Sequence, residues 1–332
     1  MEFISDYGMF AAKAATIIIV IWIVVALMIS AAHKPHDEDQ IEIKNLNKKF
    51  ANMKLMMQKA LLSKKEVRAL AKKVKKESKK KDESRKRVYV LNFVGNIKAS
   101  AVKHLRKEIT ALLSVATSKD EVVICLENAG GMVHEHGLAA SQLQRIKDRD
   151  IPLTVAVDKV AASGGYMMAC VADRIVAAPF SIIGSIGVIA QMPNFNKMLE
   201  NHGIEFEQVK AGDLKRTLTM FGKNTDEDRA RLTEQMEETH DLFKEFVSDH
   251  RSQLDITKIA TGEHWLGKKA LELQLVDELI TSDDYLLKQS EQADVYEIKH
   301  SGPKTLSEKI FANAELAFEK VLTSWWEKKL LS

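Results

Sequence analysis

A single serine stands between small residues and two glycines in the stretch 161–166, which reads AASGGY. An apolar run, IPLTVAV, precedes this stretch, and a second apolar run follows it. A serine at the start of a helix is often only an N-cap. A serine in a tight strand-to-helix turn is also suited to nucleophilic attack, because neighbouring glycines let a substrate carbonyl approach the backbone. The sequence therefore offers Ser163 as either an N-cap or a nucleophile.

Two further glycine turns accompany this serine. Residues 128–133 read NAGGMV and directly follow the apolar run EVVICLE, while residues 184–187 read GSIG. Backbone N–H groups in such turns can stabilise a developing oxyanion, at about 2.7–4 kcal/mol for each donor. Taken singly, each turn is better explained by a structural role, so only their combination indicates a catalytic site.

A serine nucleophile needs a base, and the sequence offers two kinds. Histidine is the usual choice, and His134, just after the first glycine turn, is the best placed of the ten histidines. A lysine serves instead when burial lowers its pKa. The stretch QVKAGDLKR contains Lys210 and Lys215, although the spacing alone is typical of surface lysines. The residues by themselves leave the base open.

These residues must be positioned by alternating strands and helices. Strands are expected at 88–95, 121–128, 152–158, 174–178 and 204–212. Helices are expected at 101–116, 137–150, 163–173, 194–203 and 226–251, with a further helix-rich stretch at 266–279. This alternation predicts an α/β domain with a parallel sheet and flanking helices. Strand-to-helix turns of a parallel sheet gather at one edge, so the first two glycine turns should be neighbours.

The first 33 residues are interpreted as a membrane anchor. Residues 14–32 form a run of 19 residues without a charge, which is long enough to cross a hydrocarbon core of about 30 Å. The competing interpretation is a cleavable signal peptide, which the small residues Ser30, Ala31 and Ala32 would allow. The length of the run and its acidic front favour an uncleaved, single-pass anchor.

A basic segment, 34–87, follows the anchor. Residues 33–87 carry 19 Lys and Arg against 8 Asp and Glu, a net charge of +11 in a chain whose total is +3. Apolar residues from Ile43 to Ala60 recur at helical spacing, which predicts an amphipathic helix or a short coiled coil. The lysines suit either a solvated spacer or attraction to anionic lipid. No recognition motif or aromatic interleaving supports binding to nucleic acid.

Five stretches, in order, identify a family by resemblance. They are ENAGGMVH, VDKVAASGGYMMACVADRI, IIGSIGV, IEFEQVKAGDLKR and LVDEL. Together they resemble the signal peptide peptidase A family of membrane-bound serine proteases, and most closely its SohB branch. The resemblance extends over nearly the whole chain and implies a ClpP/crotonase-like fold, in a serine peptidase domain at 88–290.

The resemblance implies a Ser-Lys dyad endopeptidase without a cofactor or a metal. Ser163 would be the nucleophile, Lys215 the general base and Ser185 the residue that orients the lysine, while the amides of Gly131 and Gly164 would form the oxyanion hole. It further implies membrane-derived peptides such as signal peptides as substrates, a homo-oligomer, and a periplasmic domain at a bacterial inner membrane. The positive-inside rule, applied to the lysines after the anchor, favours the opposite orientation.

The sequence departs from the family pattern at two places. The family usually has Ser-Pro-Gly-Gly at the first turn, where this chain has Asn128-Ala129-Gly130-Gly131. Loss of the proline loosens the turn by about 0.4–1 kcal/mol. The second departure is Gln274, where the family tends to have glycine. The altered turn keeps one rival function open, a non-catalytic membrane scaffold. A second rival, a crotonase-like acyl-CoA enzyme, follows from the implied superfamily, whose acyl-CoA enzymes have the same paired-amide oxyanion hole.

The C-terminal segment, 291–332, is expected to include an amphipathic helix. Leu306, Ile310, Ala314, Ala317, Val321 and Trp325 share one helical face. Such a face would pack on the body or on a neighbouring subunit. The alternative is an interfacial helix that uses Trp325 and Trp326 as anchors at a lipid surface.

Overall fold

A computed structural model of the chain describes residues 40–62, 85–212 and 218–301, together with positions 8, 13, 15–18, 21, 22 and 66. One compact unit spans Ile41–His300, and a second unit combines Met1–Gln40 with Ser301–Ser332. Most of the predicted anchor and the C-terminal amphipathic segment from 302 onward lie outside the described residues. Within the described part, no helix is both long enough and apolar enough to span a bilayer.

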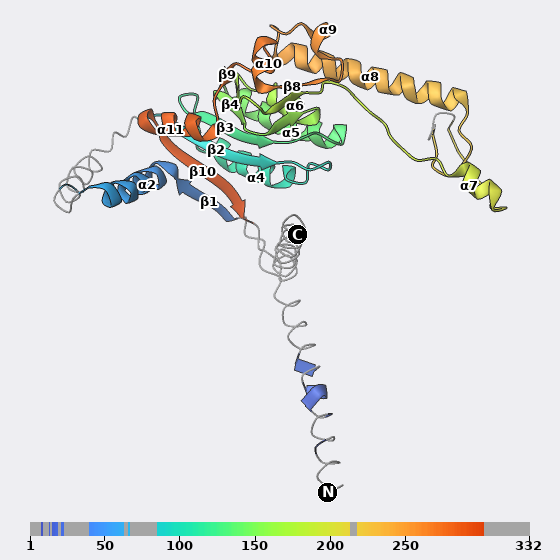
Figure 1. Cartoon of the computed structure of the whole chain (residues 1–332), viewed down its shortest axis with the longest axis horizontal. Coiled ribbons are helices and arrows are strands. Elements are labelled where there is room, and N and C mark those ends of the chain that lie inside the picture. The colour runs from blue at the N-terminus through green and yellow to red at the C-terminus, as the bar shows by residue number, and fades with distance from the viewer. Residues whose placement is uncertain are drawn as a thin grey trace, which may run out of the picture. The chain divides into compact units, whose positions relative to one another are not determined.

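The compact unit contains two sheets. The strands run over Gln40–Asn45 (β1), Arg87–Val94 (β2), Glu121–Glu127 (β3), Leu153–Val157 (β4), Val160–Ala162 (β5), Arg174–Ala177 (β6), Ile182–Gly184 (β7), His264–Leu266 (β8), Glu278–Leu279 (β9) and Asp294–Ser301 (β10). Seven of them form one sheet in the order β1-β10-β2-β3-β4-β6-β9 (Figure 1). Every pair from β10 to β9 is parallel. The predicted α/β class and parallel sheet are confirmed, and they are consistent with a ClpP/crotonase-like domain.

The helices cover both faces of the seven-stranded sheet. They run over Leu46–Leu61 (α2), Val102–Leu113 (α4), Val133–Lys147 (α5), Gly164–Ala169 (α6), Asn196–Asn201 (α7), Asp226–His250 (α8), Ile256–Ile259 (α9), Gly267–Glu272 (α10) and Ser282–Gln292 (α11). Leu91 and Ile124 belong to the cluster that includes residues of α4, α5 and α6. Val90 and Val123, which alternate with them, pack with residues of α2 and α11. Central strands buried on both faces need a continuous apolar run, and β2 and β3 have one each, VYVL and VVICL.

The smaller sheet positions the serine. It has the order β5-β7-β8, in which β5 and β7 are parallel and β7 and β8 are antiparallel. Both β5 and β7 are only three residues long, and each ends immediately before a serine, Ser163 and Ser185 respectively. This sheet therefore brings the second and third glycine turns together.

The prediction of a strand over 204–212 is wrong. The structure gives this segment no regular secondary structure, and the side chain of Val209 is fully exposed. Phe206 packs against Phe221, with ring centroids 5.9 Å apart. Alternating residues such as IEFE fit a half-buried strand, but a strand also needs a neighbour to accept its backbone hydrogen bonds. In the described part of the chain no strand lies beside this segment.

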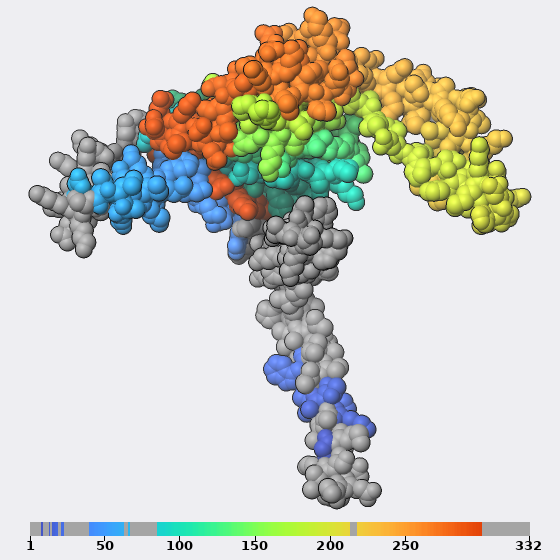
Figure 2. Space-filling model, in the orientation of Figure 1, coloured from blue at the N-terminus to red at the C-terminus, as the bar shows by residue number. Residues whose placement is uncertain are grey.

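The basic segment before residue 88 contributes two elements to the compact unit. β1 is an edge strand of the large sheet beside β10, and Ile43 lies on β1 rather than on the expected helix. The helix α2 begins at Leu46, which is buried, whereas Met53 and Met57 further along it are exposed. Figure 2 shows the blue surface of β1 and α2 against the red-orange surface of α11 and β10. Part of the segment expected to be a linker is therefore packed structure.

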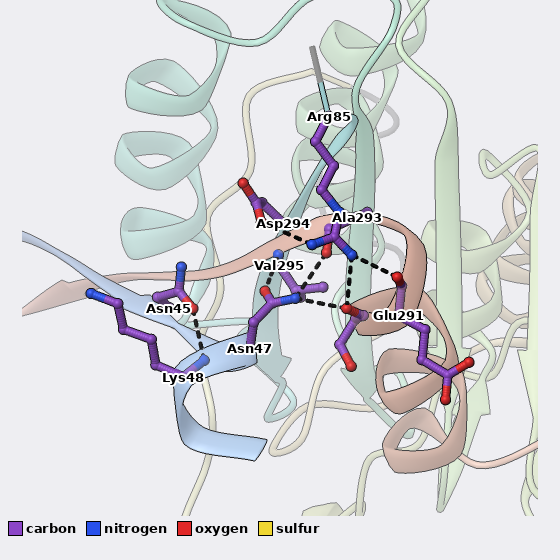
Figure 3. Close-up of polar contacts among 9 residues, drawn as sticks. Asn45, Asn47, Lys48, Arg85, Glu291, Ala293, Asp294 and Val295 are labelled. Atoms are coloured by element: carbon purple, nitrogen blue, oxygen red, sulfur yellow. Dashed lines mark hydrogen bonds and ion pairs between the residues drawn. The ribbon is translucent and has the colours of Figure 1, made fainter. Parts of the chain in front are cut away.

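Asn47 joins this segment to the end of α11 (Figure 3). Its Nδ2 atom donates to the carbonyl oxygens of Ser290 and Ala293, at 2.8 and 2.9 Å. Its Oδ1 atom accepts from the N–H of Val295 at 2.7 Å. Arg85 adds a hydrogen bond of 2.6 Å to the carbonyl of Glu291. The bonds to Ser290, Glu291 and Ala293 satisfy carbonyls that the helix end leaves without an intrahelical donor, and Asn47 Oδ1 satisfies an N–H of β10.

Replacing Asn47 with alanine is expected to lower the free energy of unfolding by about 2 kcal/mol, because three hydrogen bonds contribute about 0.5–1.5 kcal/mol each. Urea denaturation of the purified chain would measure the change. Lys48→Ala is the matched control, since Lys48 is exposed and only its backbone N–H is bonded, to Asn45. Equal stability of the two variants would show that the hydrogen bonds of the Asn47 side chain contribute nothing to the free energy of unfolding.

The backbone at position 274 explains why the family tends to have glycine there. Gln274 has a φ of 62°, in the left-handed region where glycine is favoured and other residues are strained by about 1–2 kcal/mol. Gln274→Gly is expected to raise the free energy of unfolding by about 1 kcal/mol, since part of the relieved strain is offset by the greater entropy of glycine in the unfolded chain. A urea midpoint below that of the wild type would contradict this expectation.

Candidate active site

Ser163 occupies a strained turn between β5 and α6. Its backbone has φ 52° and ψ −120°, a combination that costs about 1–3 kcal/mol for a residue with a side chain. The turn is held by a hydrogen bond of 2.8 Å from the Ser163 N–H to the carbonyl of Gly184. Ser163 holds the N-cap position of α6, but its side chain makes no capping hydrogen bond. Its hydroxyl is therefore available for chemistry.

The first glycine turn touches the serine directly. Gly130 has a φ of 93°, and a Cβ atom placed on it would lie 2.7 Å from the Cβ of Ser163 and 2.9 Å from the amide nitrogen of Gly164. Only a residue without a side chain fits this approach. The expectation that the first and second glycine turns are neighbours is confirmed.

The N–H groups of Gly131 and Gly164, near Ser163, have no acceptor among the described residues. The N–H of Gly130 is bonded to the Asn128 side chain at 2.9 Å, and that of Met132 is bonded to the carbonyl of Ile97. Between residues 85 and 212 and from 218 to 301, nothing accepts from the N–H of Gly131 or of Gly164. Such free backbone donors beside a serine are the arrangement that an oxyanion hole needs.

The third glycine turn places Ser185 beside Ser163. Ala162 at the end of β5 pairs with Gly184 at the end of β7 in parallel register. Ser163 and Ser185 are the residues that directly follow these two adjacent strands. Neighbouring strands are about 4.8 Å apart. Ser185 also has a φ of 52°, and its N–H donates to the carbonyl of Glu263 at 2.6 Å. The structure thus brings together Ser163, Ser185 and the amides of Gly131 and Gly164.

The structure brings none of the described candidate bases to Ser163. Lys215 lies in 213–217, outside the described residues. Lys210 is exposed, in the segment without regular structure. The side chain of His134 is 78% exposed and lies 3.9 Å from the carboxylate of Glu135. In the described part of the chain, no side chain hydrogen-bonds to the Ser163 hydroxyl, so the base is not identified by geometry.

Three buried polar residues beneath the turn were not predicted as site residues. Asn128 and His136 are buried and in contact, with 3.2 Å between Asn128 Oδ1 and His136 Nε2. Tyr166 is also fully buried and donates from its hydroxyl to the carbonyl of Leu275 at 3.0 Å. Burial raises the pKa of Tyr166, so this tyrosine is structural rather than a base. Asn128 stands where the family usually has the serine of Ser-Pro-Gly-Gly, and that departure is the sequence signal for the pair.

A small pocket opens beside Ser163. It is lined by Gly131, Val133, Ser163, Gly164, Met167, Gly187, Val188, Thr239 and Phe243. Its walls are mostly apolar and small, which fits an extended peptide with small or apolar side chains better than a charged ligand. Among the described residues, no group of three or more His, Cys, Asp or Glu side chains is arranged to hold a metal ion.

Comparison with known proteins gives two family matches. Residues 2–143 match the description "Peptidase family S49 N-terminal", and residues 145–296 match "Peptidase family S49". A protein of Haemophilus influenzae described as "Probable protease SohB" is 46% identical over 330 residues, which cover 95% of this chain and 94% of that protein. A "Probable protease SohB" of Buchnera aphidicola subsp. Acyrthosiphon pisum is 51% identical over 69% of this chain and 68% of its own length. A "Putative signal peptide peptidase SppA" of Enterococcus faecium is 31% identical over 50% of this chain and 48% of its own length.

Proposed function

This chain belongs to peptidase family S49, and from that premise we propose that it is a serine endopeptidase that uses a Ser163–Lys215 dyad. Neutral Lys215 takes the proton of the Ser163 hydroxyl, and the serine oxygen attacks the scissile carbonyl. The amides of Gly131 and Gly164 hold the resulting oxyanion. Lys215 then protonates the leaving amine, and water hydrolyses the acyl-enzyme. Ser185 orients the lysine.

The observation that carries this proposal is the surroundings of Ser163. The hydroxyl belongs to a strained residue without a capping bond, and the free N–H groups of Gly131 and Gly164 lie in the two turns that meet there. A serine whose only role was to cap α6 would use its side chain for that bond. An acyl-CoA enzyme would need the paired amides but not the hydroxyl.

Membrane-derived peptides, including signal peptides, are the proposed substrates. The small, largely apolar pocket beside Ser163 favours chains with small or apolar side chains. The uncharged run at 14–32 supports a single-pass anchor that keeps the site near such peptides. We place the catalytic domain on the periplasmic side of a bacterial inner membrane and expect a homo-oligomer in contact with its lipids.

Two measurements in cells test this location. Protease added to intact and to opened spheroplasts should digest the domain in both, whereas protection in intact spheroplasts would place the domain in the cytoplasm. Carbonate extraction of the full chain, with a variant lacking residues 1–32 as the control, should retain only the full chain in the membrane. Retention of both would assign membrane binding to another segment.

A fluorophosphonate probe tests the proposed chemistry directly. Such probes phosphonylate an activated serine, so the wild-type chain is expected to be labelled at Ser163 and Ser163→Ala to remain unlabelled. A Ser181→Ala variant is the matched control, because Ser181 is buried and bonded to the carbonyl of Ala178. A wild-type chain that hydrolyses CoA thioesters but no peptide would favour an acyl-CoA enzyme instead. Absence of both activities and of labelling would favour a scaffold.

A further inference from the structure

Asn128 and His136 form a buried polar pair directly beneath the two turns of the candidate oxyanion hole. Asn128 is 1% exposed and His136 is 0% exposed. Buried polar groups are costly unless they are hydrogen-bonded. The contacts that satisfy this pair therefore indicate what the pair holds in place.

Asn128 connects the first glycine turn to the strand that leads to Ser163. Its Oδ1 atom accepts from the N–H of Gly130 at 2.9 Å, which fixes the peptide next to the Gly131 amide. Its backbone N–H donates to the carbonyl of Val160 at 2.9 Å, and its carbonyl accepts from the N–H of Ala162 at 3.0 Å. A shift of Asn128 would therefore move both turns relative to each other.

His136 connects the same asparagine to the second amide. Its Nε2 atom lies 3.2 Å from Asn128 Oδ1, and its Nδ1 atom lies 2.9 Å from the carbonyl of Met132, one helical turn earlier in α5. Both oxygens are acceptors, so a neutral ring donates its single N–H to one of them and an imidazolium ring donates to both. A Cβ atom on Gly164 would lie 2.4 Å from Cγ of the His136 ring. The ring is thus the surface on which the Gly164 peptide rests.

Three glycines make room for this pair. A Cβ atom on Gly95 would lie 2.6 Å from Cγ of Asn128, and one on Gly165 would lie 2.1 Å from the carbonyl oxygen of Asn128. Gly164 does the same for the His136 ring. The two glycines after Ser163 therefore serve the packing of Asn128 and His136, in addition to leaving space for a substrate.

We propose that Asn128 and His136 are positioning residues that set the relative placement of the Gly131 and Gly164 amides. This inference rests on the proposed serine peptidase function. The family usually has a proline where this chain has Ala129, and a proline stiffens the turn by fixing its backbone. In this chain the side-chain bond from Asn128 to Gly130, supported by His136, takes over that stiffening. The altered turn is then compatible with an active enzyme.

Displacement of the two amides should destabilise the transition state more than the bound substrate. Oxyanion contacts form as charge develops on the carbonyl oxygen, so their misplacement lowers kcat and leaves KM nearly unchanged. Removing one such donor costs about 10²–10³ in kcat, and displacing it costs less. We therefore expect a loss of about 10- to 100-fold in kcat when the pair is broken.

Two amide replacements of His136 separate positioning from packing. In His136→Gln the side-chain nitrogen can reach the place of Nε2 and donate to Asn128, whereas in His136→Asn it reaches only the place of Nδ1 and the Met132 carbonyl. kcat and KM for a fluorogenic peptide are measured for both variants, for Asn128→Ala and for the double variant Asn128→Ala/His136→Asn. Ser141→Ala is the control, because Ser141 is exposed on the same helix and its hydroxyl donates only to the carbonyl of Gly137. Far-ultraviolet circular dichroism establishes that each variant is folded.

His136→Asn and Asn128→Ala are expected to lose about 10- to 100-fold in kcat with KM within about threefold of the wild type, while His136→Gln stays within about threefold in kcat. The double variant should lose no more than about threefold beyond either single variant, because the pair acts as a unit. Equal kcat for His136→Asn and His136→Gln would overturn the inference, and these two variants decide it if Asn128→Ala does not fold. A wild-type chain without turnover or fluorophosphonate labelling would instead refute the proposed function.

Discussion

Ser163→Ala is expected to lower kcat for peptide cleavage by at least about 10⁴-fold, because removal of the nucleophile leaves only binding and the oxyanion hole to act on the substrate. KM should change little, since the hydroxyl contributes to bond formation rather than to ground-state binding. The measurement is single-turnover and steady-state hydrolysis of a fluorogenic peptide with small apolar side chains. Residual activity within tenfold of the wild type would exclude Ser163 as the nucleophile.

A second replacement at the same position separates loss of chemistry from loss of fold. Ser163→Gly should be as inactive as Ser163→Ala, because both lack the hydroxyl. Glycine adopts φ 52° without strain, so Ser163→Gly is expected to exceed Ser163→Ala in free energy of unfolding by about 1 kcal/mol. A glycine variant that is less stable than the alanine variant would show that the turn is not strained in the folded enzyme.

The parts of the fold that could be predicted are those in which local pattern and tertiary environment agree. The segments that form β2 and β3 each contain a continuous apolar run, VYVL and VVICL, and that pattern fits a strand buried on both faces. The three glycine turns were also evident, because glycine next to an apolar run marks a sharp turn. The sequence therefore predicted that Ser163 would lie near Gly130 and Gly131.

The parts that could not be predicted depend on long-range pairing. The strand expected over 204–212 has the right alternation but no described neighbour, and alternation does not specify a partner. The side-by-side placement of Ser163 and Ser185 follows from the register of β5 and β7, two strands too short to have a periodic signature. Burial of Asn128 and His136 was not predicted because polar residues next to a glycine turn are normally exposed.

Lys215→Ala is expected to reduce kcat by about 10³- to 10⁴-fold, because an unassisted serine hydroxyl keeps its proton near neutral pH. Lys210→Ala is the matched control, since Lys210 lies in the same stretch and is exposed; we expect it to retain full activity. A loss of kcat in Lys210→Ala and none in Lys215→Ala would identify Lys210, rather than Lys215, as the general base. Activity retained in both variants would indicate that a histidine, rather than a lysine, is the general base.

The pH dependence identifies the base more sharply than its removal does. A general base works in its neutral form, so kcat/KM of the wild type should rise as pH increases through the pKa of Lys215 in the free enzyme. That pKa must lie below about 10.4, the value of lysine in water, for activity near neutrality. Lys215→Cys should be inactive. The cysteine is then alkylated with 2-bromoethylamine, and its thiolate displaces bromide. The resulting side chain has the length of lysine but contains a sulfur atom, and its amine is less basic than that of lysine.

The alkylated Lys215→Cys variant is expected to recover activity with the rising limb of its pH profile moved to lower pH. The reagent should spare the native cysteines, because thiolates are the reactive form and burial raises the pKa of Cys125 to about 12 and also raises that of Cys170. Wild-type enzyme treated in the same way should keep its profile. Recovered activity with an unshifted profile would mean that the restored amine orients the site while another group accepts the proton of Ser163.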